Sequence, residues 1–172
     1  LITDGGPAVV LALNLHSSNS EPDIRTFFYP HFGTTLQGYT ATQASLWDKQ
    51  LRFIDLLAGR YSADLLEPPP DNGGSSFASN PFPESWWWVN FQDRVMAMTI
   101  EMTYGRSGFA PRWITPDDTR QLGAALARTI GDYCNGTAGA ASLQKSAWGR
   151  ATTRQLLYPD RYPPNAGDEL KY

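Results

Sequence analysis

Three short segments of the chain are apolar or nearly so, and they are too short for buried helices. Residues 8–15 follow a Gly-Pro break, residues 26–29 stop at Pro30, and residues 95–100 end at Glu101. A short, continuously apolar run bounded by turn residues is typical of a strand covered on both faces. We therefore expect three strands, with residues 8–15 central in a sheet that helices cover.

Two longer segments carry apolar residues at helical spacing. The first runs from residue 40 to residue 58, where Gly59 is the expected C-cap. The second begins at Thr115, a good N-cap followed by Pro116 and two acidic residues, and is expected to stop at Gly136. Strands separated by helices predict an α/β fold, a mixed and largely parallel sheet with helices on both faces.

Between these elements lies a segment rich in aromatic and turn residues. Residues 66–83 contain three consecutive prolines and predict a long loop of the kind used for lids and binding loops. The three tryptophans at 86–88 suit either core and lid packing, the commoner use, or a stacking platform for sugars. Cys134 is expected to be a small core residue, and His31 a loop histidine.

Composition narrows the classes of function. The chain has 172 residues, 41% of them hydrophobic and 18% charged, which suits one compact globular unit. A net charge of -3, with 14 scattered Lys and Arg residues, disfavours a nucleic-acid partner. The longest apolar run is too short to span a membrane. A single cysteine cannot build a thiolate zinc site, so any metal must be held by imidazole and carboxylate groups. The cell compartment stays open.

Two residues at the ends of predicted strands could take part in metal binding or catalysis. His16 follows the first apolar strand and Glu101 follows the last, and ligands of open α/β sheets bind outside the carboxyl ends of strands. A neutral imidazole is a zinc ligand, and an ionised Glu beside a metal-bound water is a general base. Each residue also has an ordinary interpretation: a hydrogen-bonded structural histidine, and a glutamate turned to solvent. Together they predict part of a hydrolytic metal site.

These residues resemble the zinc carboxypeptidases of the funnelin type. The resemblance lies in the strand and polar residues at 13–18, in residues 98–102, and in the helix from Thr115, and it covers about residues 1–136. In that family the His after such a strand is the third zinc ligand, and the Glu of the second strand is the general base and acid. The resemblance therefore implies a Zn²⁺ cofactor, with His16 as a metal ligand and Glu101 as the catalytic residue.

The resemblance also implies that this chain holds only part of a catalytic domain. The family's first two zinc ligands come from a His-x-x-Glu motif that would lie upstream of the first residue here, with the Arg and Asn that bind a substrate carboxylate. We expect residues 1–136 to be the C-terminal part of the domain, with the missing N-terminal half as its partner. Residues 137–172 are expected to be an extension packed on or beside it. No Tyr lies between Tyr61 and Tyr104, where the family has a substrate-contacting Tyr, so substrate-binding residues stay unassigned.

The function hypothesis from the sequence is a zinc-dependent hydrolase of peptide or peptide-like amide bonds, resembling a metallocarboxypeptidase. The chain alone is expected to be inactive. A zinc-dependent deacylase of N-acyl amino acids is the second enzyme hypothesis. The alternative from another class is a catalytically inactive binding module of the same fold.

Overall fold

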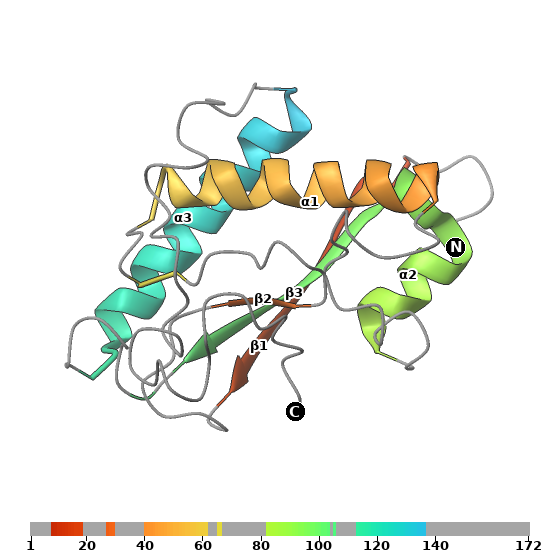
Figure 1. Cartoon of the computed structure of the whole chain (residues 1–172). Helices are drawn as coiled ribbons and strands as arrows, with labels where there is room; N and C mark the ends of the chain where they lie inside the picture. The colour runs from red at the N-terminus through yellow and green to blue at the C-terminus, as the bar shows by residue number, and fades with distance from the viewer. Residues whose placement is uncertain are drawn as a thin grey trace, which may run out of the picture.

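The computed structural model describes residues 8–18, 27–29, 40–61, 65–66, 82–103, 105 and 113–136. In chain order the elements are β1 (Leu11–Ser18), β2 (Phe27–Tyr29), α1 (Ala41–Ala58), α2 (Pro83–Phe91), the 3₁₀ turn η3 (Gln92–Arg94), β3 (Met96–Thr103) and α3 (Pro116–Cys134). The strands form one sheet with helices packed against it (Figure 1). Our predictions for His31, for most of the 66–83 loop and for residues 137–172 lie outside the described residues. None of the helices in the described part of the chain combines the length and apolar character that a membrane crossing requires.

The central strand of the described sheet is β3. It pairs with β1 in parallel and with β2 antiparallel, so the sheet is mixed and the strand order is β1-β3-β2. The predicted α/β class is confirmed. The prediction that the first apolar strand is central is wrong for the described sheet, because β1 lies at its edge and Leu15 is 63% exposed. The prediction that helices cover this strand on both faces is also wrong, because residues 11–14 are only partly buried and Leu15 is exposed. An apolar run does not tell whether a strand has neighbours on both sides.

Helices cover both faces of β3, as predicted. Successive side chains of a strand point to opposite faces. Met96, Met98 and Ile100 pack with buried residues of α1 and α3, whereas Ala97 and Thr99 contact α2. β3 is therefore almost inaccessible to solvent over its first half, which suits its continuously apolar sequence.

Both long strands run further than their apolar patterns predict. β1 continues through His16 to Ser18, and β3 continues through Glu101 to Thr103, because the parallel pairing persists as far as Ser18 opposite Thr103. The two predicted site residues therefore lie inside paired strands and not just beyond them. Backbone pairing holds these polar residues in extended conformation after the hydrophobic pattern has stopped.

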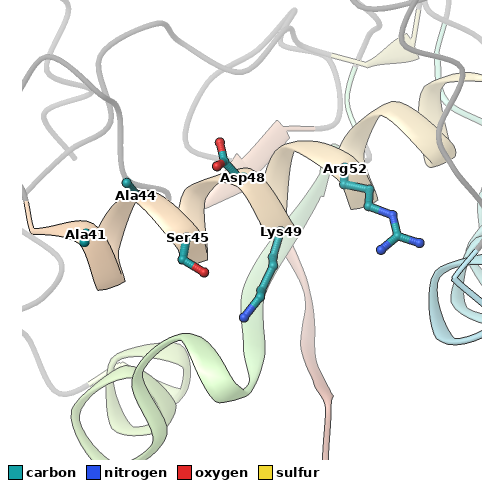
Figure 2. Close-up of a pocket in the computed structure, with 6 residues that line it drawn as sticks. All are labelled: Ala41, Ala44, Ser45, Asp48, Lys49 and Arg52. Atoms are coloured by element: carbon teal, nitrogen blue, oxygen red, sulfur yellow. The ribbon is translucent and has the colours of Figure 1, made fainter.

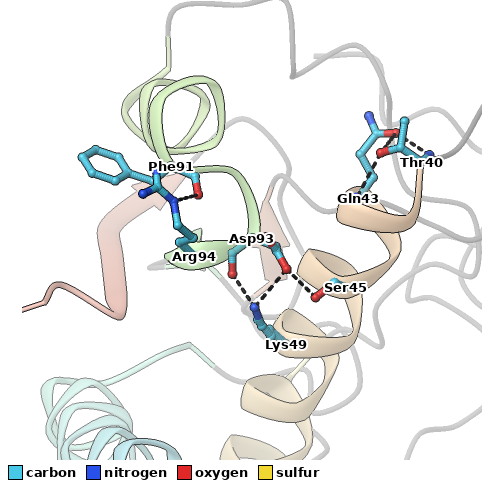
Figure 3. Close-up of polar contacts among 7 residues, drawn as sticks. All are labelled: Thr40, Gln43, Ser45, Lys49, Phe91, Asp93 and Arg94. Atoms are coloured by element: carbon cyan, nitrogen blue, oxygen red, sulfur yellow. Dashed lines mark hydrogen bonds and ion pairs between the residues drawn. The ribbon is translucent and has the colours of Figure 1, made fainter.

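The two long helices begin at the predicted N-caps. Thr40 forms a capping box with Gln43, whose side chain accepts a bond from the Thr40 amide at 2.9 Å (Figure 3). Thr115 forms the same device with Asp118, and Pro116 occupies the first turn. Local sequence alone therefore fixes where α1 and α3 start.

The helix ends differ in detail from the prediction. Gly59 is the C-cap of α1 but has an ordinary right-handed conformation, with φ of -70°. α3 ends at Cys134, and Gly136 follows with φ of 72°, the left-handed conformation that glycine adopts readily. Cys134 is exposed, so its assignment to the core was wrong. The buried face of α3 includes Leu126 and Thr129, and Cys134 lies off that face by helical periodicity.

Helix α2 was not predicted from the sequence. Its start signals were Pro83 at the first helical position and Glu84 in the first turn, in front of the tryptophans. Trp88 is 6% exposed and packs into the core, whereas Trp86 is 52% exposed. Core packing therefore describes Trp88 and not Trp86.

Side chains from α1 and α2 bind the backbone near the start of β3. The described part of β2 pairs with the segment from Thr99 to Glu101, so among the described residues no strand pairs with the carbonyl of Ala97 on that side. Gln50 Nε2 of α1 donates to this carbonyl at 2.9 Å, and Trp88 Nε1 of α2 donates to it at 3.3 Å. Because a buried unpaired carbonyl is costly, these two bonds tie both helices to the central strand.

A second polar network attaches α1 to the turn that leads into β3. Ser45 Oγ donates to Asp93 Oδ2 at 2.6 Å, and Lys49 Nζ donates to both the carboxylate and the carbonyl of Asp93 (Figure 3). The preceding residue, Gln92, is exposed and has φ of 52° and ψ of -130°. This conformation is strained for any residue with a Cβ atom, so the network holds a strained turn in place.

Replacing Gln92 by Gly is expected to raise the free energy of unfolding by about 1 kcal/mol, because glycine adopts the positive φ without strain. Urea unfolding measures the change. The matched control is Gln121→Gly on the exposed side of α3, where the same substitution in helical backbone should lower stability by about 1 kcal/mol. Equal destabilisation at both positions would contradict the strained conformation of Gln92.

The hydrogen bond from Ser45, the largest effect, holds the pKa of Asp93 below its ordinary value of 3.8. A carboxyl group with a lowered folded-state pKa stabilises the fold above its unfolded pKa and loses that contribution as the pH falls through the folded value. Ser45→Ala should therefore lower the free energy of unfolding by about 1 kcal/mol near neutral pH. The deficit should shrink below about pH 4. Urea titrations at several pH values test this, and in an Asp93→Asn background the effect of Ser45→Ala should not depend on pH.

Candidate functional site

His16 and Glu101, 85 residues apart in sequence, face each other across the β1–β3 pair. They occupy opposite positions in the register, and His16 Nδ1 lies 3.1 Å from Glu101 Oε2. The side chain of His16 is 63% exposed and that of Glu101 is 15% exposed. The structure thus brings both predicted site residues together, near the carboxyl ends of two parallel strands and open to solvent.

The contact constrains the protonation of the imidazole. An ionised carboxylate can only accept hydrogen bonds, so beside ionised Glu101 the proton of the His16 ring lies on Nδ1. A neutral ring in this tautomer leaves the lone pair of Nε2 free to act as a base or a metal ligand. If Nδ1 is instead to bind a metal, Glu101 must leave it. The pair as arranged is therefore a carboxylate-oriented histidine.

Polarity increases along this face of the sheet toward the site. The first paired positions are Ala12 and Ala97, which lie in the apolar cluster around Trp88. The next are Asn14 and Thr99, which are hydrogen-bonded, and after them come the exposed His16 and the partly buried Glu101. The pleat alone places these six residues on one face, because they alternate with residues of the opposite face.

The row below the pair contains functional candidates that sequence reasoning missed. Asn14 Nδ2 donates to Thr99 Oγ1 at 3.2 Å, and Thr99 Oγ1 donates to Glu84 Oε2 of α2 at 2.6 Å. The signal was present, since Asn14 and Thr99 each stand two residues before a predicted site residue and interrupt an apolar run. Glu84 had only its place in the first turn of a helix that was not predicted.

His16 and Glu101 carry groups that can bind zinc, but two such groups are too few for a catalytic zinc site. An imidazole and a carboxylate are ordinary zinc donors, but a catalytic zinc site takes three protein ligands. Among the described residues, no three His, Cys, Asp or Glu side chains lie together as potential metal ligands. Any remaining ligands would have to come from residues other than those described.

A shallow groove lies along α1, and its lining residues do not include His16 or Glu101 (Figure 2). Two of its charged side chains contact neighbouring elements. Lys49 is bound to Asp93, and the guanidinium of Arg52 lies over the ring of Tyr133, 5.1 Å from the ring centroid. Because both cations are engaged in packing α1 onto its neighbours, this groove is a weaker candidate for chemistry than the strand-end pair.

No protein-family model matches the chain, and no curated protein sequence matches it. Among solved structures, the chain is similar to the crystal structure of a metallo-carboxypeptidase from Burkholderia cenocepacia, with a TM-score of 0.49 and 16% sequence identity over 77% of this chain. The chain spans 32% of the length of that protein. The functional assignment therefore has to rest on the residues of this chain.

The His16–Glu101 pair is expected to contribute little to stability, because ion pairs and hydrogen bonds open to solvent gain little over their contacts with water. His16→Ala and Glu101→Gln should each change the free energy of unfolding by less than about 1 kcal/mol. Met98→Ala, in the fully buried centre of β3, should cost about 2 to 5 kcal/mol. Urea unfolding of the three variants tests this contrast, and a loss of several kcal/mol for either site variant would mean that the pair is structural.

Proposed function

We propose that the chain is part of a zinc-dependent hydrolase of peptide or peptide-like amide bonds. The observation that carries the proposal is the 3.1 Å contact between His16 Nδ1 and Glu101 Oε2 at paired strand positions. Each residue was singled out from the sequence by its strand alone, yet the fold unites them at an accessible sheet end. Ligands of α/β sheets bind at that end.

The two residues have different roles in this proposal. His16 would be one metal ligand, and zinc, when bound, would supply a Lewis acid that lowers the pKa of a coordinated water into the neutral range. Glu101 would accept a proton from the attacking water at a carboxylate oxygen and return it to the amine that leaves. Its partial burial, at 15% exposure, keeps the carboxylate close to the sheet while leaving it reachable by substrate.

The proposal requires further metal ligands outside the described residues. We propose that they belong to an N-terminal half of the same catalytic domain, with a His-x-x-Glu motif as the resemblance implies. Such a segment would dock beside β1, the edge of the described sheet, where Leu15 and Val10 are exposed apolar side chains. The 172-residue chain alone should then bind zinc weakly and be inactive.

The test uses the full-length gene product, its metal content and its hydrolysis of short peptides and of N-acyl amino acids. Wild type should hold about one zinc per molecule, and His16→Ala should lose most of it. Glu101→Gln should keep the zinc and lose roughly a hundredfold or more in kcat, because it removes the general base.

Two results would count against hydrolysis of peptide bonds as the function. A wild-type protein without metal, indifferent to both substitutions, would leave a binding module as the function of this fold. Preference for N-acyl amino acids over peptides would instead assign it to the deacylase class. Asp117→Asn, at an exposed carboxylate of α3 that pairs with Arg120, is the control for a general effect of carboxylate loss.

A further inference from the structure

A buried polar row lies directly below the His16–Glu101 pair. It consists of Asn14, Thr99 and Glu84, which come from β1, β3 and α2. Thr99 and Glu84 are each 2% exposed. Asn14 and Thr99 are opposite each other in the register, one same-face position before the site pair. Residues that are neighbours on the same face of a strand are about 6 to 7 Å apart, so this row lies next to the pair on that face of the sheet.

The hydrogen bonds of the row have a fixed direction. Thr99 has one hydroxyl hydrogen, and it is donated to Glu84 Oε2 at 2.6 Å, a length typical of a hydroxyl bound to a carboxylate. Toward Asn14 the hydroxyl can therefore only accept, which orients the Asn14 amide with Nδ2 toward Thr99 at 3.2 Å. One carboxylate thus fixes the side chains immediately below both members of the pair.

Packing alone does not explain this row. Burying a carboxylate costs free energy, and apolar side chains of similar volume would fill such a site at lower cost. The first turn of α2 offsets part of the cost, because the amino end of a helix favours negative charge. Buried polar residues that cost stability are expected where they specify a particular geometry.

We propose that Thr99 is a positioning residue for the His16–Glu101 pair, with Glu84 as its anchor and Asn14 as its link to β1. The row sets the side-chain conformations of the pair and the place of α2 beside it. Its consequence for catalysis rests on the proposed function, but its effect on the geometry of His16 does not.

The test compares Thr99→Val, which removes the hydroxyl, with Thr99→Ser, which keeps it. The control is Thr129→Val, the same change at a fully buried threonine of α3 whose hydroxyl has no hydrogen-bond partner within the described part of the chain. The first readout is the ¹⁵N chemical shifts of the His16 ring in the 172-residue chain, which report which nitrogen carries the proton. The chain has two histidines, and His31→Gln assigns their signals.

Thr99→Val should move the His16 ring shifts toward those of the urea-unfolded chain, whereas Thr99→Ser and Thr129→Val should leave them at the wild-type values. In an active full-length protein, Thr99→Val should also lower kcat by roughly tenfold to a hundredfold with little change in KM, because misplaced catalytic groups react slowly. If Thr99→Val does not fold, Asn14→Ala breaks the same row at a half-buried position and should shift the His16 signals in the same direction.

Unchanged His16 shifts in a folded Thr99→Val or Asn14→Ala variant would overturn the proposal. Unchanged kcat of Thr99→Val in an active full-length enzyme would overturn it as well. If the full-length wild type is inactive, the proposed function fails by itself, and the His16 shifts still decide whether the row positions the pair.

Discussion

The parallel register between β1 and β3 is the constraint on which the site depends. Opposite positions in this register join Leu11 to Met96 at one end and Ser18 to Thr103 at the other. A slip of one residue would turn every side chain of the shifted strand to the other face of the sheet. If β1 slipped by one residue, His16 would point to the side of α1 and α3, while Glu101 on β3 would stay on the opposite face. Leu11 and Leu13 of β1 oppose such a slip, because in the observed register they pack against the buried cluster that β3 forms with α1 and α3.

Helix α2 connects the stability of this sheet with the architecture of the site. In its carboxyl-terminal half, Trp88 donates to the Ala97 carbonyl, and in its first turn Glu84 accepts a bond from Thr99. The helix therefore runs antiparallel to β3, with its amino end toward the exposed pair. The same nine-residue helix binds the backbone of the central strand and supplies the buried carboxylate below the site.

Local signals made much of this fold predictable. Thr40 and Thr115 are N-caps whose chemistry acts within four residues, so both long helices were predicted at their starts. A rule about strand ends singled out His16 and Glu101, but their direct contact was not predicted, because it depends on the register of the two strands. The neighbours of each strand in the sheet were not predictable, because no local feature of the sequence indicates that β1 lies at the edge of the described sheet. Helix α2 was not predicted, because its apolar residues do not gather on one face. Trp86 and Trp88 differ in exposure only because of tertiary packing.

The distribution of polarity along one face is the strongest reason to regard the sheet end as functional. A sheet that served only to bury α2 would be apolar at Asn14 and Thr99, as it is at the alanines before them, because an apolar floor costs less desolvation. The chain instead has a hydrogen-bonded row that ends in a buried carboxylate. Next to this row lie His16 and Glu101, and because His16 is largely exposed, their contact is expected to add little to stability. Thr99 and Glu84 are shielded from water and hold the local structure, whereas His16 and Glu101 lie where water and a substrate can reach them. A preorganised site requires this arrangement, because side chains that a rigid buried layer holds in place need little reorganisation when a ligand binds.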